Sequence, residues 1–327
     1  MSKNLRILLD GYIDGNFGDD LMLYLAADGL KEHKLYITSP KLDIAEYTEE
    51  KSGFDCYLKV TGSGFLIHNN KGIAYRMRDM YREKRYSKNR AVINCNISGF
   101  INRVAEKVIQ KQISDYDFVT VRDRYSYEYI TKNIPNVKCE KYPDMVLSLS
   151  DGMIPNVHSE NALGISVHNS ADINLLAEIA DRFINETGRN VCLLCFNTGL
   201  EDDVSVANQV YGIMKNKHMT EIIRYTDINY MLKNIKRCRA ILGIRFHSAM
   251  LALRMGVPVV PIAYSDKTKN ALDEIGYSGK IYDVNNIDTD EVLKSILNAV
   301  PYKLDGNIIK SAENHIKRFD EYIKRQC

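Results

Sequence analysis

Residues 237–264 read RCRAILGIRFHSAMLALRMGVPVVPIAY, and this stretch decides the fold. The apolar run before Arg245 is typical of a buried strand. A helix is expected from about Ser248, and Gly256 is placed to end it. The apolar run after Gly256 contains prolines and predicts a second strand. A strand, a helix and a strand in this order indicate parallel strands joined by a crossover helix.

The same alternation extends in both directions along the chain. In the first half, strands are expected at LRILL, LYIT, YLKVTG, AVINCNI and DFVTV, with helical segments at 19–31, 71–88, 100–113 and 125–133. In the second half, strands are expected at ALGISVH, NVCLLCF, EIIRY, RAILGI, VPVVPIAY and KIYDV, with helical segments such as 172–186 and 204–214. Both halves are therefore predicted to be parallel α/β layers.

The length of 327 residues favours two domains, because one hydrophobic core rarely serves so long a chain. The alternation breaks at 148–162, SLSDGMIPNVHSENA, which is rich in residues typical of loops. We therefore expect two Rossmann-like domains, 1–155 and 156–305, with a ligand cleft between them. Residues 306–327 predict an amphipathic helix that packs back on the N-terminal domain.

The charge of the chain excludes some classes of function. Its 44 basic and 42 acidic side chains leave a net charge of +2, so no nucleic-acid partner is expected and any positive patch must be local. The N-terminus lacks the pattern of a signal peptide, and no apolar run approaches the ~20 residues of a membrane span. We expect a cytoplasmic protein. Seven scattered cysteines indicate neither a disulfide framework nor a metal site.

Two loops that follow expected strands are rich in glycine. In LLDGYIDGNFGDDLML, Gly18 permits close approach of the backbone, and Asp19 either caps the next helix or presents a carboxylate to a sugar hydroxyl. In VTGSGFLIHNN, Gly62 and Gly64 either form a turn or offer their backbone to a ligand. Ligands of open α/β sheets bind beyond the carboxyl ends of the strands, so both loops are candidates for a site.

Two further strand ends carry charged side chains. Arg122 ends DFVTVRDRYSYEYI and either pairs with Asp123 at the surface or reaches into the cleft. In Arg245-Phe246-His247, residues two apart in extended chain would share a face and present a fixed cation beside a titratable imidazole. That pair suits proton transfer on a phosphorylated substrate.

The next strand end offers Tyr264 and Lys267 as additional substrate contacts.

With these motifs the sequence resembles the polysaccharide pyruvyl transferase family. The resemblance is carried by GYIDGNFGDD, VTGSGFL, FVTVRDRYS, the YPDMVL segment with Asp144, and IRFHSAMLALRMGVPVVPIAY, in family order from about residue 7 to residue 270. Two positions depart from the family pattern: Ser63 stands where a third glycine is usual, and GDD replaces the commoner GDE.

The resemblance implies a GT-B-like fold and transfer of pyruvate from phosphoenolpyruvate to a sugar as a ketal. Arg122, Arg245 and His247 match positions of donor binding and catalysis, and Asp19 matches the loop acid. His247 would be the general acid and base, while Asp19 would orient or deprotonate a hydroxyl.

Phosphoenolpyruvate is then the donor substrate, with no separate cofactor and no metal. The acceptor would be a sugar or a lipid-linked oligosaccharide, and a lipid-linked acceptor would bring peripheral membrane association with it.

Two other functions fit the same sequence features. One is a GT-B-like glycosyltransferase that uses a nucleotide sugar, which would release a nucleotide instead of phosphate. The other is a non-catalytic protein that binds a sugar or an anion on the same scaffold.

Overall fold

The computed structural model describes residues 4–67 and 69–326, which form two compact units. Unit 1 comprises residues 1–13, 19–148 and 310–327, and unit 2 comprises residues 14–18 and 149–309. Residues 14–18 are therefore a short part of unit 2 that lies, in sequence, between two segments of unit 1.

Unit 1 is built on a seven-stranded sheet of order β3-β2-β1-β4-β5-β6-β7 with all pairs parallel. Its central strands are buried along their length because helices cover both faces of the sheet. The strands are β1 (Arg6–Asp10), β2 (Lys34–Ile37), β3 (Glu46–Tyr47), β4 (Cys56–Val60), β5 (Arg90–Cys95), β6 (Phe118–Val121) and β7 (Cys139–Lys141).

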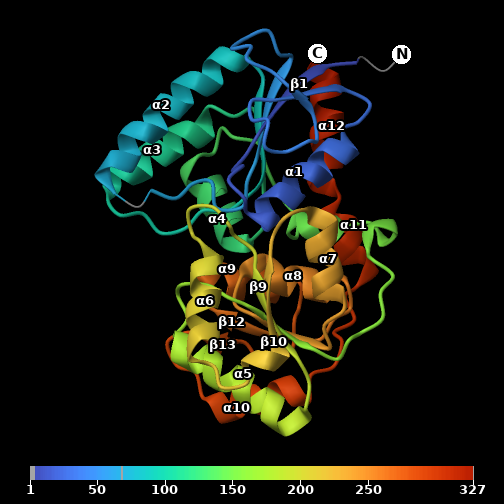
Figure 1. The fold of residues 1–327 in the computed structure, drawn as a ribbon. Helices are drawn as coiled ribbons and strands as arrows, with labels where there is room; N and C mark the ends of the chain where they lie inside the picture. The colour runs from blue at the N-terminus through green and yellow to red at the C-terminus, as the bar shows by residue number, and fades with distance from the viewer. Residues whose placement is uncertain (1–3, 68, 327) are drawn as a thin grey trace. The chain divides into compact units, whose positions relative to one another are not determined.

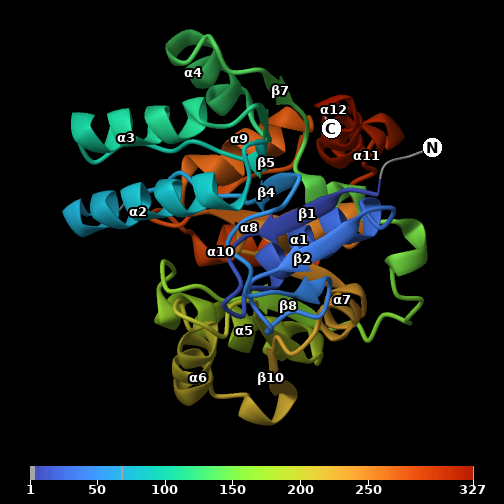
Figure 2. The ribbon, with the colours of Figure 1, turned by 90° about the horizontal axis from the view of Figure 1, so that it is seen from above.

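The helices of unit 1 divide between the two faces of this sheet. One face is covered by α2 (Asn70–Tyr86), α3 (Arg103–Ser114) and α4 (Arg124–Asn133), whose apolar residues pack in one cluster with those of β1, β4, β5 and β6. Figures 1 and 2 show α2 and α3 lying side by side. The helix α1 (Phe17–Gly29) meets α12 (Asn314–Gln326), which packs on β5 and β6.

Unit 2 is built on a six-stranded sheet of order β10-β9-β8-β11-β12-β13, also parallel throughout. Its central strands β8 and β11 are fully buried, as expected for a sheet covered on both faces. The strands are β8 (Leu163–Ser166), β9 (Val191–Cys195), β10 (Thr220–Arg224), β11 (Ala240–Gly243), β12 (Val259–Ala263) and β13 (Tyr282–Asp283).

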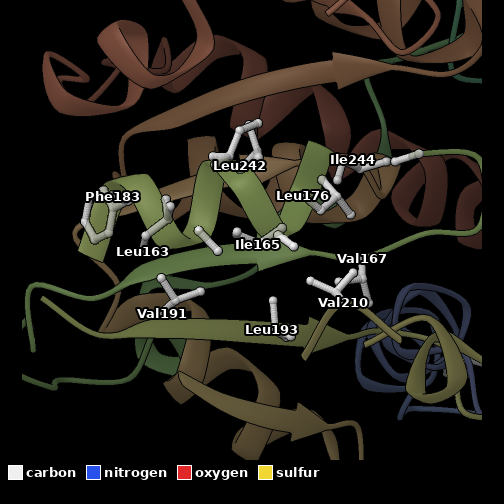
Figure 3. Close-up of a cluster of buried hydrophobic side chains, with 14 of the residues drawn as sticks. Leu163, Ile165, Val167, Leu176, Phe183, Val191, Leu193, Val210, Leu242 and Ile244 are labelled. Atoms are coloured by element: carbon white, nitrogen blue, oxygen red, sulfur yellow. The ribbon is translucent and has the colours of Figure 1, made fainter. Parts of the chain in front are cut away.

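The core of unit 2 lies between this sheet and three helices. These are α5 (Ile173–Thr187), α6 (Asp203–Ile213) and α10 (Thr289–Leu297). Figure 3 shows side chains of α5 and α6 packed with those of β8, β9 and β11. The remaining helices are α7 (Ile228–Lys236), α8 (Phe246–Arg254), α9 (Asp266–Glu274) and α11 (Gly306–Ala312). Short 3₁₀ helices occur at Met145–Ser148, Asp151–Met153 and Lys217–Met219.

Three boundaries differ from the sequence expectation. The main passage into unit 2 comes at Leu149 instead of residue 156, and residues 14–18 also belong to unit 2. The single helix expected at 306–327 is two helices, α11 and α12, and the chain passes from unit 2 to unit 1 at Lys310, within α11. None of the helices within the described residues is long and apolar enough to cross a membrane.

Candidate active site

The centre of the unit 2 sheet has the topology of a ligand site. β8 and β11 are neighbours, yet the chain continues from β8 to β9 on one side and from β11 to β12 on the other. Loops that leave adjacent strands in opposite directions open a crevice beyond the carboxyl ends of those strands. His168 follows β8 at this point, and Arg245 and His247 follow β11.

Two serines fix the turn from β11 into α8. Ser166 Oγ of β8 accepts hydrogen bonds from the backbone N–H groups of Ile244, at 2.8 Å, and Arg245, at 3.1 Å. Ser166 Oγ also lies 2.7 Å from Ser248 Oγ, which donates to the Arg245 carbonyl. β11 ends at Gly243 and α8 begins at Phe246, so Arg245 is the residue before the helix and His247 lies in its first turn. The expectation that Arg245-Phe246-His247 is extended, with a helix from Ser248, was therefore wrong.

Arg245 is a buried cation held by carboxylates, not a free one. Its Nε donates to Asp203 Oδ2 at 3.0 Å and its Nη2 to Asp203 Oδ1, a bidentate pair in which Asp203 is fully buried. Its Nη1 donates to Glu201, whose side chain is 51% exposed. Burial alone would lower the pKa of Arg245. The hydrogen bonds and charge of Asp203, and then of Glu201, outweigh burial and raise this pKa. Asp203 thus anchors one edge of the guanidinium, and Glu201 occupies the edge that a ligand could reach.

Gly18 makes room for the imidazole of His247. A Cβ atom at residue 18 would lie 1.8 Å from His247 Nδ1, so only glycine fits there. The segment that carries Gly18 is fixed within unit 2, because Phe17 packs on Phe196 and Tyr225 with ring centroids 5.1 and 5.4 Å apart. The Phe17 N–H also donates to the Phe196 carbonyl at 2.9 Å. Gly18 was predicted from its loop, and the structure gives it a steric role beside His247.

Asp19 follows Gly18 in the first turn of α1 and is half-buried. The alternative that Asp19 caps this helix was wrong, because α1 begins at Phe17. The side chain of Asn16 caps it instead, accepting from the Gly18 N–H at 3.0 Å. The role of Asp19 as a carboxylate that faces a sugar hydroxyl stays a prediction.

His168 is a candidate that the sequence analysis missed. Its ring stacks on Tyr264 with centroids 4.4 Å apart and planes at 20°. The Ser170 N–H donates to His168 Nδ1 at 3.1 Å, which places the hydrogen of the neutral ring on Nε2. Burial, followed by the charge of Arg245, lowers the pKa of His168 to about 4. The only signal in the sequence was its position at a strand end, in ALGISVH.

Tyr264 and Lys267 extend this group. Lys267 Nζ lies 4.9 Å from the centroid of the Tyr264 ring, and its charge acts on both His168 and Glu201. Within the described residues, no carboxylate lies within salt-bridge distance of Lys267. The edge of unit 2 thus brings together five of the predicted residues: Gly18, Arg245, His247, Tyr264 and Lys267.

A second group of predicted residues meets at the carboxyl edge of the unit 1 sheet. Arg122 follows β6, and its Nη1 donates to Asp144 Oδ2 at 2.6 Å while its Nη2 donates to Asn96 Oδ1 at 3.1 Å. The guanidinium packs on Gly62, where an added Cβ would lie 2.8 Å from Nη1. Gly64 serves the turn after β4, since a Cβ there would lie 2.4 Å from Thr61.

The alternative that Arg122 pairs with Asp123 at the surface was wrong. Arg122 is buried against Asp144, whereas Asp123 caps α4 by accepting from the Ser126 N–H at 2.8 Å. The charge of Arg122 is therefore balanced by Asp144 within unit 1. Its role in binding a donor stays a prediction.

Within residues 4–67 and 69–326, no group of three or more histidine, cysteine or acidic side chains is placed to hold a metal ion.

Comparison with known proteins gives a family and a fold. The family described as polysaccharide pyruvyl transferase matches residues 16–266. Among curated proteins, none matches this chain in sequence.

Several solved structures resemble the chain over nearly its whole length. UDP-GlcNAc 2-epimerase of Neisseria meningitidis, solved bound to UDP-GlcNAc, has a TM-score of 0.65 at 12% identity and covers 98% of this chain and 99% of its own. The corresponding enzyme of Methanocaldococcus jannaschii has a TM-score of 0.63 at 12% identity, covering 98% and 100%. UGT2 of Phytolacca americana, solved with UDP-2fluoro-glucose and pterostilbene, has 0.51 at 10%, covering 99% and 95%. These matches confirm two parallel-sheet α/β domains of GT-B-like fold.

Proposed function

Because the chain belongs to the polysaccharide pyruvyl transferase family, we propose that it transfers the pyruvyl group of phosphoenolpyruvate to two hydroxyl groups of a sugar. The family name itself implies a sugar or polysaccharide acceptor. The observation that carries the proposal is the position of His247. It lies against Gly18 and beside Arg245, beyond the carboxyl end of β11, where the strand order of the unit 2 sheet reverses between β8 and β11. An ionisable ring held at such a point is suited to proton transfer on a bound ligand.

The donor requires cations, because phosphoenolpyruvate carries a carboxylate and a phosphate. Lys267 supplies one cation, since no carboxylate of the described residues lies within salt-bridge distance of it. Arg245 Nη1 supplies a second once the donor displaces the half-exposed carboxylate of Glu201. Asp203 would remain in place and hold the guanidinium plane during this exchange.

The proposed chemistry uses His247 as the acid. Protonation of the methylene carbon by His247 leaves an oxocarbenium-like centre at the neighbouring carbon, and a first sugar hydroxyl adds to it. A second hydroxyl then displaces phosphate and completes the ketal. One hydroxyl proton balances the proton gained by the methylene carbon, and the other leaves with phosphate. Asp19 is proposed as the group that orients or deprotonates a hydroxyl.

His168 would act in this site as a neutral group. Its Nδ1 accepts from Ser170, so Nε2 is a hydrogen-bond donor near Tyr264 and Lys267. A pKa of about 4 means that the ring gains no charge near neutral pH. We propose that His168 orients the donor or the acceptor and does not exchange protons with it.

The test is incubation with phosphoenolpyruvate and a panel of glycans, following phosphate release and the mass of the product. His247→Gln should lower kcat by at least about hundredfold and leave thermal unfolding unchanged. His218→Gln is the matched control, because His218 is an exposed histidine of the same unit. Release of a nucleotide from a nucleotide sugar would favour the glycosyltransferase alternative, and ligand binding without turnover would favour a binding protein.

Gly18→Ala tests the geometry of the same site without replacing a titratable residue. The added methyl would lie 1.8 Å from the unmoved His247 Nδ1, so the imidazole must shift and kcat should fall. Gly212→Ala is the control, because nothing lies within 4 Å of a Cβ at that helical glycine. Equal activity of both variants would reject the assignment of His247.

A further inference from the structure

The helix α2 concentrates positive charge in a chain that is otherwise almost neutral. It has six basic and two acidic side chains, a net charge of +4, whereas the whole protein has a net charge of +2. Any positive patch was expected to be local, and this helix carries one. Its basic residues are Lys71, Arg76, Arg78, Arg82, Lys84 and Arg85.

The two acidic residues of α2 do not offset this charge on the outer face. Glu83 is only 3% exposed and accepts a hydrogen bond from Lys59 at 2.7 Å, so it belongs to the inner face. Asp79 is half-buried and pairs with Arg82 at 3.3 Å. The exposed face is left with cations that include Lys71, Arg78 and Arg85.

Large apolar and aromatic side chains stand among these cations. Tyr75, Met77 and Tyr81 are 64%, 59% and 67% exposed, far more than side chains of this kind in a packed helix. Two more stand at the start of the neighbouring helix α3: Ile101, just before the helix, at 46%, and Val104, in its first turn, at 58%. The helices α2 and α3 lie side by side on one face of the unit 1 sheet (Figures 1 and 2), so exposed residues of both are near one another.

A hollow lies at the N-terminal end of α2. It is about 360 Å³ in volume and is lined by Lys71, Tyr75 and Arg76, together with Asn69 and Asp79. Lys71, Arg76 and the N-terminus of α2 outweigh the one carboxylate in this lining, Asp79, and favour an anionic group. A phosphate head group is of a size to enter it.

We propose that this surface, the outer face of α2 with the start of α3, binds the anionic face of a phospholipid membrane. Cations attract anionic lipids, tyrosine rings are favourable at the boundary between head groups and acyl chains, and Met77, Ile101 and Val104 can enter that boundary. Such binding would hold the enzyme where a lipid-linked acceptor is found. Vesicle binding can be measured without turnover, so it can fail independently of the proposed function.

Two other occupants fit the surface less well. A nucleic acid would use the cations but gains nothing from exposed aliphatic side chains such as Ile101 and Val104. A second copy of the chain would pair this face with itself about a two-fold axis, which would bring Arg78 and Arg85 against like charges.

The experiment is sedimentation of the full chain with vesicles of phosphatidylglycerol and phosphatidylcholine, against vesicles of phosphatidylcholine alone. We expect binding to the anionic vesicles only, weakened by salt. The triple variant Lys71→Gln, Arg78→Gln and Arg85→Gln should bind roughly a hundredfold more weakly, since each basic side chain near an anionic surface contributes about fivefold. The variant pair Tyr75→Ser and Tyr81→Ser should weaken the binding that remains at high salt.

The matched control removes the same charge elsewhere. Lys233, Lys294 and Lys303 are exposed in unit 2, and their change to glutamine should leave vesicle binding intact. Circular dichroism of each variant checks that it is folded. Equal binding by the α2 triple variant and the control variant would overturn the proposal. So would failure of the wild-type chain to sediment, or a self-association or RNA binding that the α2 substitutions abolish while vesicle binding is absent.

Discussion

At the scale of single residues, Glu201 pairs with the accessible edge of the Arg245 guanidinium, so an anionic donor that binds as proposed would have to displace the Glu201 carboxylate. Burial alone would raise the pKa of Glu201, but the hydrogen bond from Arg245 outweighs burial and lowers it. Glu201 therefore stays ionised near neutral pH. The half-exposed Glu201 is the exchangeable partner, while the fully buried Asp203 is not. Glu201 would thus compete with any anionic donor for the same guanidinium.

We expect Glu201→Gln to lower the apparent KM for phosphoenolpyruvate with little change in kcat. A half-exposed ion pair contributes up to about 1 kcal/mol, so the fall should reach at most about fivefold. Rates of phosphate release at varied donor concentration measure it. Glu178→Gln is the control, because Glu178 pairs with Arg182 on α5 as an exposed residue of the same unit. A higher KM in Glu201→Gln would mean that Glu201 positions Arg245 instead of competing for it.

The sequence could predict which residue types stand at the strand ends, but not their partners. Arg245 was expected as a free cation because Glu201 and Asp203 lie more than 40 positions earlier, where nothing in the sequence marks them as its partners. For the same reason neither alternative considered for Arg122, a surface pair with Asp123 or a free reach into the cleft, included its partner Asp144. Pairing across a sheet edge depends on strand order, which periodicity does not determine.

At the scale of elements, α12 is tied to the sheet of unit 1 by one buried histidine. His315 Nδ1 lies 2.6 Å from Thr120 Oγ1, and its Nε2 lies 2.9 Å from the Pro143 carbonyl. Thr120 and Pro143 each belong to a segment that carries one member of the Arg122–Asp144 pair. Burial is the main cause that lowers the pKa of His315 to about 4.

This low pKa predicts a loss of stability in acid. Between the ordinary histidine value near 6.5 and about 4, the unfolded chain binds a proton that folded His315 does not bind, so unfolding becomes easier as the pH falls through this range. The loss from one such histidine is about 2 kcal/mol at pH 5. His168, also with a pKa of about 4, acts in the same direction in unit 2.

Thermal unfolding of His315→Gln from pH 7 to pH 5 tests this expectation. The variant is less stable at pH 7, because its contacts with Thr120 and Pro143 are altered, but its melting temperature should fall less steeply with acid. His218→Gln, at an exposed position, should keep the slope of the wild type. Parallel slopes for His315→Gln and the wild type would contradict the low pKa.

Element boundaries show where periodicity stops being informative. The helix expected at 71–88 lies at Asn70–Tyr86, and the one expected at 125–133 lies at Arg124–Asn133, because a capping residue stands before each. The apolar pattern of 306–324 predicted one helix, and α11 and α12 are two. The passage from unit 2 to unit 1 falls within α11, and a periodic pattern does not show which core each apolar side chain joins.

At the scale of the whole molecule, the sequence predicted two parallel α/β layers because β/α alternation is a property of local segments. The change in loop composition predicted the domain boundary near residue 155, and the structure has this boundary at Leu149. The sequence could not predict that residues 14–18 join unit 2. Backbone bonds to residues 196–198 and the packing of Phe17 on Phe196 and Tyr225 support that assignment, and all of these partners lie far along the chain.

Phe17 is therefore expected to stabilise unit 2, although the segments on either side of residues 14–18 belong to unit 1. Its side chain is fully buried, and truncation of a buried phenylalanine costs about 3–5 kcal/mol. Phe17→Ala should lower the stability of unit 2 by about that amount, and kcat should fall with it because the adjacent Gly18 supports His247.

Calorimetric and circular dichroism unfolding curves measure the loss, and Phe17→Leu is the control that keeps most of the buried volume. If Phe17→Ala melts like the wild type, residues 14–18 are not part of the core of unit 2. If it loses stability but keeps full kcat, the loop stabilises unit 2 without positioning the imidazole.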